Sequence, residues 1–183
     1  MAFSLEGEVT DDAVKDPIYI NNAGLVLTGP FLPHLFQTLN MFSPDDGTRW
    51  RDAATVSRAV HLLQYLVDGR TDTPEPLLVL NKILCGVPVA TPIEKAIELT
   101  DWERQACERL LKAMIANWKI IEHTSIAGLR ETFLQREGRL EHTADDWKLK
   151  VQRKTVDVLV DQIPWSIAIV YHRWMPQPLY VNW

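Results

Sequence analysis

The side chains that most often perform acid–base or metal chemistry are spread thinly along this chain of 183 residues. Imidazole groups typically bind zinc when they recur at short, fixed spacings or lie one helical turn apart. The five histidines match neither pattern: they are His34, His61, His123, His142 and His172. His61 precedes two leucines in a helical pattern and is interpreted as a structural residue rather than a general base. The sequence predicts no catalytic residue, no metal site and no cofactor.

Other motifs that carry chemistry either do not occur or have a simpler explanation. The sequence contains no glycine-rich phosphate loop and no Gly-x-Ser-x-Gly nucleophile motif. Pairs of aspartates stand at residues 11–12, 45–46 and 145–146. These segments are predicted to be leader or turns, where aspartate is favoured because it hydrogen-bonds its own backbone. An enzymatic hypothesis would require a hydrolase that uses His61 or His123, and no motif supports it.

Composition and charge argue against several classes of protein. The chain is 46% hydrophobic and 23% charged, with a net charge of −5. A clear excess of Lys and Arg is usual in proteins that bind duplex nucleic acid or an anionic membrane surface, and here it is missing. No apolar stretch approaches the roughly 20 residues that span a bilayer, and the acidic start is unlike a secretory signal. Cys85 and Cys107 lie in apolar surroundings, which favours reduced core thiols over a disulfide or a reactive thiol.

A basic stripe lies in the last quarter of the chain. Lys148, Lys150, Arg153 and Lys154 stand close to Trp147, an arrangement superficially similar to grooves that bind single-stranded nucleic acid. One solvated face of a strand explains the stripe more simply, because Lys148 and Lys150 alternate with apolar residues. We therefore expect no nucleic-acid partner.

Tryptophan is concentrated near the C-terminal end of the sequence. Three of the seven tryptophans lie between residues 165 and 183, interleaved with prolines and apolar residues, which predicts ordered strands. Trp174, Met175 and Trp183 are candidates for protein binding, because exposed aromatic groups often carry the energy of an interface. The simpler alternative is that they belong to the core or cover a sheet edge.

Hydrophobic periodicity predicts helices in the first two thirds of the chain. The clearest begins at a capping box, in which Thr100 and Glu103 can each bond the other's backbone amide. Apolar residues then recur at three- and four-residue spacing from Trp102 through Trp118 to Ile121, which predicts a helix of about twenty residues with both tryptophans in the core. Further helices are predicted near residues 31–42, between the turn at 43–48 and Gly69, over 76–86 with Gly86 as the cap, and over about 125–136.

From residue 138 the pattern changes to that of a sheet. Trp147, Leu149 and Val151 alternate with polar residues, which predicts a strand with one buried face and a buried Trp147. Residues 138–142 can pair with this strand as a hairpin across the turn 143–146. Residues 165–171 and 178–183 predict one or two more strands, and residues 18–20 could join the same sheet.

These elements predict an α+β fold, mainly helical in its first two thirds, followed by a small antiparallel sheet near the C-terminus. Residues 1–16 carry five acids and one lysine without clear periodicity, and are interpreted as a flexible acidic leader. Residues 17–183 are interpreted as a single globular domain, because a chain of this length can build one sizeable core.

Several segments, in their order along the chain, resemble the contractile injection system tape measure family. Among them are Leu-Asn-Lys-Ile-Leu-Cys-Gly at 80–86 and Leu-Arg-Glu-Thr-Phe-Leu-Gln-Arg-Glu-Gly at 129–138. The other matching segments are residues 18–26, 30–33, 59–66, 164–165 and 174–183. The resemblance implies a component of extracellular, phage-tail-like particles, in which such proteins are thought to set tube length and connect with the baseplate. It brings no catalytic residues with it.

Length limits what this chain could do in such a particle. As one straight helix 183 residues would reach only about 275 Å, and folded compactly they span about 40 Å. The chain is therefore interpreted as the globular terminal domain of a tape measure protein rather than as a complete ruler. Its acidic leader would then be part of the joint to a longer segment.

We expect a non-enzymatic structural protein that docks onto baseplate, spike or tube-initiating subunits and is linked to tube-length control. Its expected partners are the baseplate, spike and inner-tube proteins, with no nucleic acid and no membrane. Several copies per particle, including a homo-oligomer, would match symmetric tail rings. The protein would be assembled in the cytoplasm and then carried in a released extracellular particle. The alternative is a chaperone-like adaptor that binds a disordered cargo or tape segment in a groove between the helices and the sheet.

Overall fold

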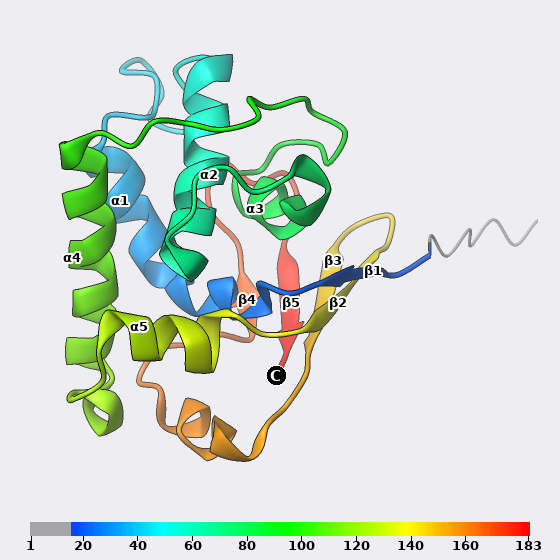
Figure 1. The fold of residues 1–183 in the computed structure, drawn as a ribbon. Coiled ribbons are helices and arrows are strands. Elements are labelled where there is room, and N and C mark those ends of the chain that lie inside the picture. Colours follow the sequence, from blue (N-terminus) through cyan, green and yellow to red (C-terminus); the bar gives the residue numbers. More distant parts are fainter. Residues whose placement is uncertain (1–15) are drawn as a thin grey trace, which may run out of the picture.

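A computed structural model of the chain describes residues 16–183. The predicted acidic leader, apart from Asp16, lies outside the described residues. The predicted α+β class is confirmed: the helices come first and most of the sheet comes last. Figure 1 shows α1, α2, α4 and α5 grouped on the left of the view and the β2–β3 hairpin on the right. Among the described residues, no helix has both the length and the apolar character needed to cross a bilayer.

The α-helices are α1 (Leu32–Thr38), α2 (Ala53–Asp68), α3 (Val79–Leu84), α4 (Asp101–Asn117) and α5 (Ile126–Leu129). The other helical segments, of 3-10 or π type, are η1 (Ala23–Phe31), η2 (Glu75–Leu77), η3 (Lys119–Ile121), η4 (Arg130–Leu134), η5 (Thr155–Val158) and η6 (Val160–Gln162). The predicted stops are confirmed, because Gly69 and Gly86 follow α2 and α3 with φ angles of 76° and 69°. Positive φ at these positions suits glycine, which has no Cβ to clash.

The capping box at the start of α4 forms as predicted. The Thr100 side chain accepts from the Glu103 amide at 3.2 Å, and the Glu103 carboxylate accepts from the Thr100 amide at 3.0 Å. Glu103 also accepts two hydrogen bonds from Arg58 of α2, at 2.7 and 2.5 Å. The helix start is therefore fixed to its neighbour as well as capped.

The prediction that Trp102 belongs to the core is wrong. Its side chain is 49% exposed, and the guanidinium of Arg109 lies 5.4 Å from its ring. Residues four apart on an α-helix differ by about 40° in direction, because four residues make slightly more than one turn. Trp102 lies eight residues before the buried Leu110, so its side chain points about 80° away from the direction of the core. Trp118 is fully buried as predicted, although α4 ends before it and η3 carries the chain to Ile121.

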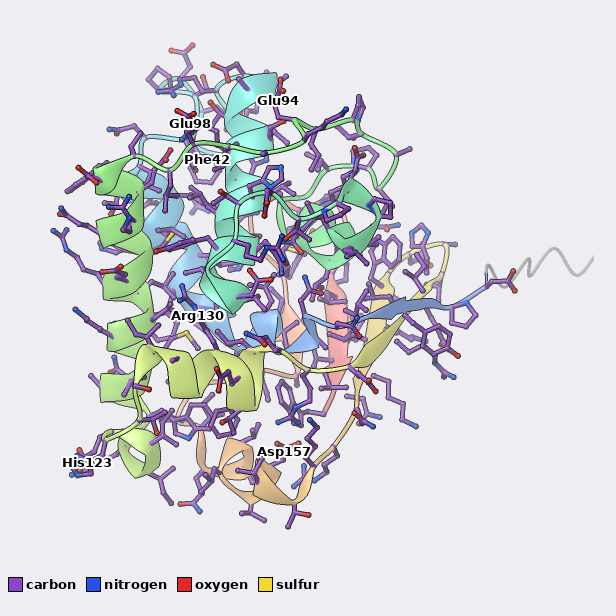
Figure 2. All side chains as sticks on the ribbon, in the orientation of Figure 1. Phe42, Glu94, Glu98, His123, Arg130 and Asp157 are labelled. Atoms are coloured by element: carbon purple, nitrogen blue, oxygen red, sulfur yellow. The ribbon has the colours of Figure 1, made fainter. Side chains whose placement is uncertain are left out.

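The predicted helix over residues 125–136 is shorter and less regular than expected. α5 ends at Leu129 and continues as the π-helical turn η4, after which Arg136 is already outside the helix. The side chain of Arg130 donates to the carbonyls of Tyr65 and Leu66 at 2.8 and 3.1 Å. Both carbonyls belong to the last turn of α2, where the Tyr65 carbonyl also accepts from the amide of the cap residue Gly69. Arg130 therefore fixes the two helices together (Figure 2).

The sheet contains β1 (Ile18–Ile20), β2 (Gly138–His142), β3 (Trp147–Val151), β4 (Ile169–Val170) and β5 (Leu179–Asn182), in the order β1-β2-β3-β5-β4. The predicted hairpin is confirmed residue for residue, because Gly138 pairs with Val151 and His142 with Trp147. β1 joins the edge of the sheet beside β2, as predicted. One pairing differs from the antiparallel prediction: β3 and β5 are parallel, since η5 and η6 lie in the connection between them and return the chain to the same end.

One hydrophobic cluster extends from Ile20 of β1 to Leu179 of β5 and includes residues of all five α-helices. The sheet contributes its inward residues to this cluster, and Leu140, Leu149 and Leu179 are almost completely buried. The outward residues of the same strands are largely exposed. Within the part of the chain that the structure describes, these outward residues form a largely exposed surface. The boundaries of the predicted domain, 17–183, stay a prediction.

Candidate docking surface

The two histidines considered as bases do not share a site. His61 is buried in α2, where its Nε2–H donates to the backbone carbonyl of Glu94 at 2.7 Å. His123 is exposed and lies at the opposite end of the molecule from Glu94 (Figure 2). Within residues 16–183, no three His, Cys, Asp or Glu side chains are grouped so that they could hold a metal ion. His61 thus bonds the backbone, and His123 lies 3.6 Å from the carboxylate of its neighbour Glu122.

The two cysteines are free and buried, as the sequence predicts. Burial raises the pKa of the Cys107 thiol to about 12 and raises the pKa of the Cys85 thiol even further. A thiol reacts as its thiolate, so both groups are held in the unreactive form at neutral pH. The cysteines therefore behave as core residues.

Trp174 and Met175, two of the predicted protein-binding residues, make extensive contacts within the chain. The indole N–H of Trp174 donates to the Leu84 carbonyl at 2.8 Å, and that of Trp50 donates to the Cys85 carbonyl at 2.8 Å. Both carbonyls stand at the end of α3, where helix carbonyls lack internal partners. Met175 is buried, with 4% of its surface exposed. This segment caps α3, and any additional contact of Trp174 with a partner stays a prediction.

Trp183, the third predicted protein-binding residue, contacts a buried ion pair. Arg136 and Asp157 are both fully buried and are joined by two hydrogen bonds of 2.6 and 2.8 Å. The indole N–H of Trp183 donates to Asp157 at 2.9 Å, and the Arg136 guanidinium lies 5.3 Å from the Trp183 ring. Burial raises the pKa of Asp157, but hydrogen bonds from Arg136, Lys154 and Trp183 outweigh it, and the pKa is lowered overall. The last residue of the sequence is thus fixed by an internal charge pair.

The outer face of the sheet is formed by the outward-pointing residues of its five strands. Across the strands one row runs Tyr19, Arg139, Lys150 and Asn182, and the next runs Glu141, Lys148, Tyr180 and Ile169. We call these eight residues the outer sheet face. Tyr19 is 75% exposed and Tyr180 is 42% exposed. Tyrosine and arginine are the residue types most often found at the energetic centre of protein interfaces.

The outer sheet face is also basic, although the whole chain is acidic. It carries three cations and one anion, and Arg139 pairs with Glu141 at 2.8 Å. Lys148 and Lys150 have no acidic partner among the residues that the structure describes. The other two residues of the basic stripe are placed elsewhere: Arg153 pairs with Asp161, and Lys154 lies beyond the end of β3. The sheet therefore divides the stripe. Among residues 16–183, it leaves Lys148 and Lys150 without an acidic partner on the face that also carries Tyr19 and Tyr180.

A second candidate surface is an apolar groove of about 570 Å³ beside the tip of the hairpin. It lies between the start of β1, the turn after α3 and the segment that follows Met175. We call it the hairpin groove; its lining includes Ile18, Val87, Val89, Leu140, Trp147 and Pro176. Trp147 is half-buried rather than in the core, because its indole stacks on His142 with ring centres 4.1 Å apart. The sequence alone did not reveal this groove, since its lining comes from segments far apart in the chain.

A family model described as contractile injection system tape measure protein matches residues 4–183. The chain belongs to this family. The suspected resemblance is therefore confirmed over nearly the whole sequence. No curated protein and no solved structure matched the chain.

Membership makes this tape measure family protein a structural component related to contractile injection systems, which are extracellular particles. It gives no residue a catalytic role. A structural component works through contacts with neighbouring proteins, so the surfaces described above are candidate sites for such contacts. Tyr19, Tyr180 and Ile169 of the outer sheet face were missed by sequence reasoning. Their strands were predicted, but only the register of the sheet shows that they share one face.

Proposed function

We propose that this protein is a non-enzymatic assembly component that docks onto baseplate, spike or tube-initiating subunits of a contractile injection particle. In this role it fixes one end of the tape while the rings of the tube stack, and so contributes to length control. Several copies bind in each particle, and assembly in the cytoplasm precedes release of the particle. Family membership supports the setting, and the outer sheet face supports the docking.

One observation carries the docking proposal: among residues 16–183, the outer sheet face presents exposed tyrosines together with two lysines that have no acidic partner. The outer face of an antiparallel sheet is normally solvated. Exposed tyrosine and arginine side chains are enriched in protein interfaces, and the two lysines suit the charged rim that would meet an acidic partner. The free face of this small sheet also offers a rigid support, because its inner residues are packed into the core. A partner can therefore bind without reorganising the fold.

Co-purification with candidate partners tests this proposal. The tagged chain is expressed together with the baseplate, spike and tube-initiating proteins of the same particle, and separately with unfolded toxin fragments. We expect retention of at least one particle protein and loss of that retention in Tyr180→Ala/Lys148→Glu. The matched control is Trp102→Ala/Lys112→Glu, which removes an exposed aromatic group and reverses a lysine on α4. Equal binding by both variants would show that the outer sheet face is not the docking surface.

The hairpin groove favours a second function, that of a chaperone-like adaptor for a disordered cargo or tape segment. Its apolar lining and its position beside the edge strand β1 suit an extended peptide with apolar side chains. Val89→Glu would place a charge in this groove, while Ala96→Glu adds the same charge at an exposed position outside its lining. Binding of toxin fragments that is lost only in Val89→Glu would support the adaptor and oppose docking through the outer sheet face.

A further inference from the structure

We propose that the acidic segment of residues 6–12 binds the outer sheet face of its own chain. The segment contains Glu6, Glu8, Asp11 and Asp12 and no basic residue. The surface that it would meet holds two lysines without an acidic partner among residues 16–183. This inference goes beyond the proposed function and does not depend on it, because it concerns a contact within one chain.

The sheet register places the lysines close to the point from which the segment departs. Residue 16 lies two residues before the start of β1, which forms one edge of the sheet. Tyr19 pairs with Arg139 and Arg139 with Lys150, so that Lys150 lies two strands from the edge. With strands about 4.8 Å apart, this separation is about 10 Å. Lys148 lies on the same strand, β3, and faces the same side.

The linking residues are long enough to bring opposite charges together. Asp12 lies four positions before Asp16, and an extended chain covers about 13 Å over that distance. Glu6, ten residues before Asp16, can reach about 33 Å, which exceeds the width of a five-stranded sheet of about 19 Å. All four acids can therefore reach the outer sheet face without strain in the connection.

Charge complementarity and tethering both favour this occupant over a free acidic peptide. Four negative charges within seven residues face three positive charges and one negative charge on the sheet. A tether of only a few residues keeps the segment at an effective concentration of about a millimolar, so that a weak electrostatic contact is still populated. An external partner that uses the same face must then displace the segment. This competition would limit docking to partners that bind more strongly than the tethered acids.

Paramagnetic relaxation measured by NMR tests the contact in the full chain. A nitroxide is attached at Ser4→Cys, and the native cysteines do not compete for the label because both are buried. We expect the amide signals of residues 148 and 150 to lose most of their intensity in about 0.01 M salt and to regain it near 1 M, where the Debye length is only about 3 Å. The amides of Lys112 and Lys119, exposed on α4 and η3, serve as reference signals and should keep their intensity.

Charge reversal then separates a specific contact from a general effect. Lys148→Glu/Lys150→Glu should restore the signals, whereas the matched control Lys112→Glu/Lys119→Glu should leave the broadening unchanged. Reversing the four acids of residues 6–12 to lysine in the sheet variant should restore the contact, which also excludes misfolding as the cause of its loss. The proposal is overturned by equal broadening at the sheet and α4, by insensitivity to Lys148 and Lys150, or by broadening only between different molecules in a mixed sample.

Discussion

Removing the carboxylate of Asp157 should destabilise the fold far more than removing an exposed carboxylate nearby. Asp157 accepts two hydrogen bonds from Arg136 and one each from Trp183 and the Lys154 amide. In Asp157→Ala the guanidinium of Arg136 stays fully buried but loses its counter-charge. Its remaining partners are the backbone carbonyls of Gln152 and Thr132, which carry no full charge.

The expected loss follows from the cost of an uncompensated buried charge. Breaking a buried ion pair by removing one partner typically lowers the free energy of unfolding by about 3–5 kcal/mol. For a domain of this size, each kcal/mol shifts Tm by about 2–4 °C, so Asp157→Ala should lower Tm by about 6–20 °C. Replacing both charges, in Arg136→Met/Asp157→Leu, should recover part of this loss because no buried charge remains. Recovery is incomplete, since Trp183 and several backbone groups still lose a partner.

Urea and thermal unfolding followed by tryptophan fluorescence measure these effects. The matched control is Asp161→Ala, which breaks the Arg153–Asp161 pair, whose side chains are 48% and 56% exposed. We expect this control to unfold close to the unmodified chain, because exposed ion pairs contribute little. If Asp157→Ala is no less stable than Asp161→Ala, the assignment of the buried pair as a major stabilising contact is refuted.

The same variant has a defined pH dependence. The pKa of Asp157 is lowered in the folded chain, so its unfolded form binds protons more readily than its folded form. The stabilisation is complete above the unfolded pKa of about 3.9 and is lost as the pH falls through the lower folded value. The stability difference between the unmodified chain and Asp157→Ala should therefore shrink below about pH 4 and stay constant near neutrality. A difference that grows on acidification would contradict this sign.

Two substitutions and one labelling experiment test the packing and the helix cap. Gly24→Ala should prevent stable folding, or lower the free energy of unfolding in urea by at least about 1–3 kcal/mol, because the added Cβ would lie 1.8 Å from a backbone oxygen. The control is Gly29→Ala, which should be tolerated because the nearest atom to its added Cβ would be 3.5 Å away. Thr100→Ala should lower the free energy of unfolding by about 1 kcal/mol through loss of the helix cap, and Thr100→Ser should restore it. Cys85 and Cys107 should react with a thiol reagent only after unfolding, and rapid labelling of the native chain would show that they are not buried.

Local patterns in the sequence were sufficient wherever the determining contacts are close in the chain. The capping box at Thr100 and the hairpin across residues 143–146 both depend on residues a few positions apart, and both were predicted correctly. The exposure of Trp102 was not predicted, because the three- and four-residue spacing was followed too far back along α4, to a residue that already points away from the core. The parallel pairing of β3 with β5 also depends on the path of an intervening segment, which has no local signal.

The candidate docking surface was only half visible in the sequence. Lys148 and Lys150 were recognised as one solvated face of a strand, but the tyrosines that flank them come from residues 19 and 180, at opposite ends of the chain. In the same way, Trp183 was recognised as an ordered terminal residue, while its contact with the buried Arg136–Asp157 pair was not. Neither arrangement has a fixed sequence spacing that could reveal it.

The sequence by itself determined the family, the α+β class, the helix caps and the hairpin. The caps and the hairpin depend on residues close together in the chain, and the family and fold class depend on the order of segments along it. The tertiary structure alone decided which residues share the outer sheet face, which segments enclose the hairpin groove and which charges are buried together. The physical reason is that burial and neighbourhood depend on packing between distant segments, and packing is a property of the whole folded chain.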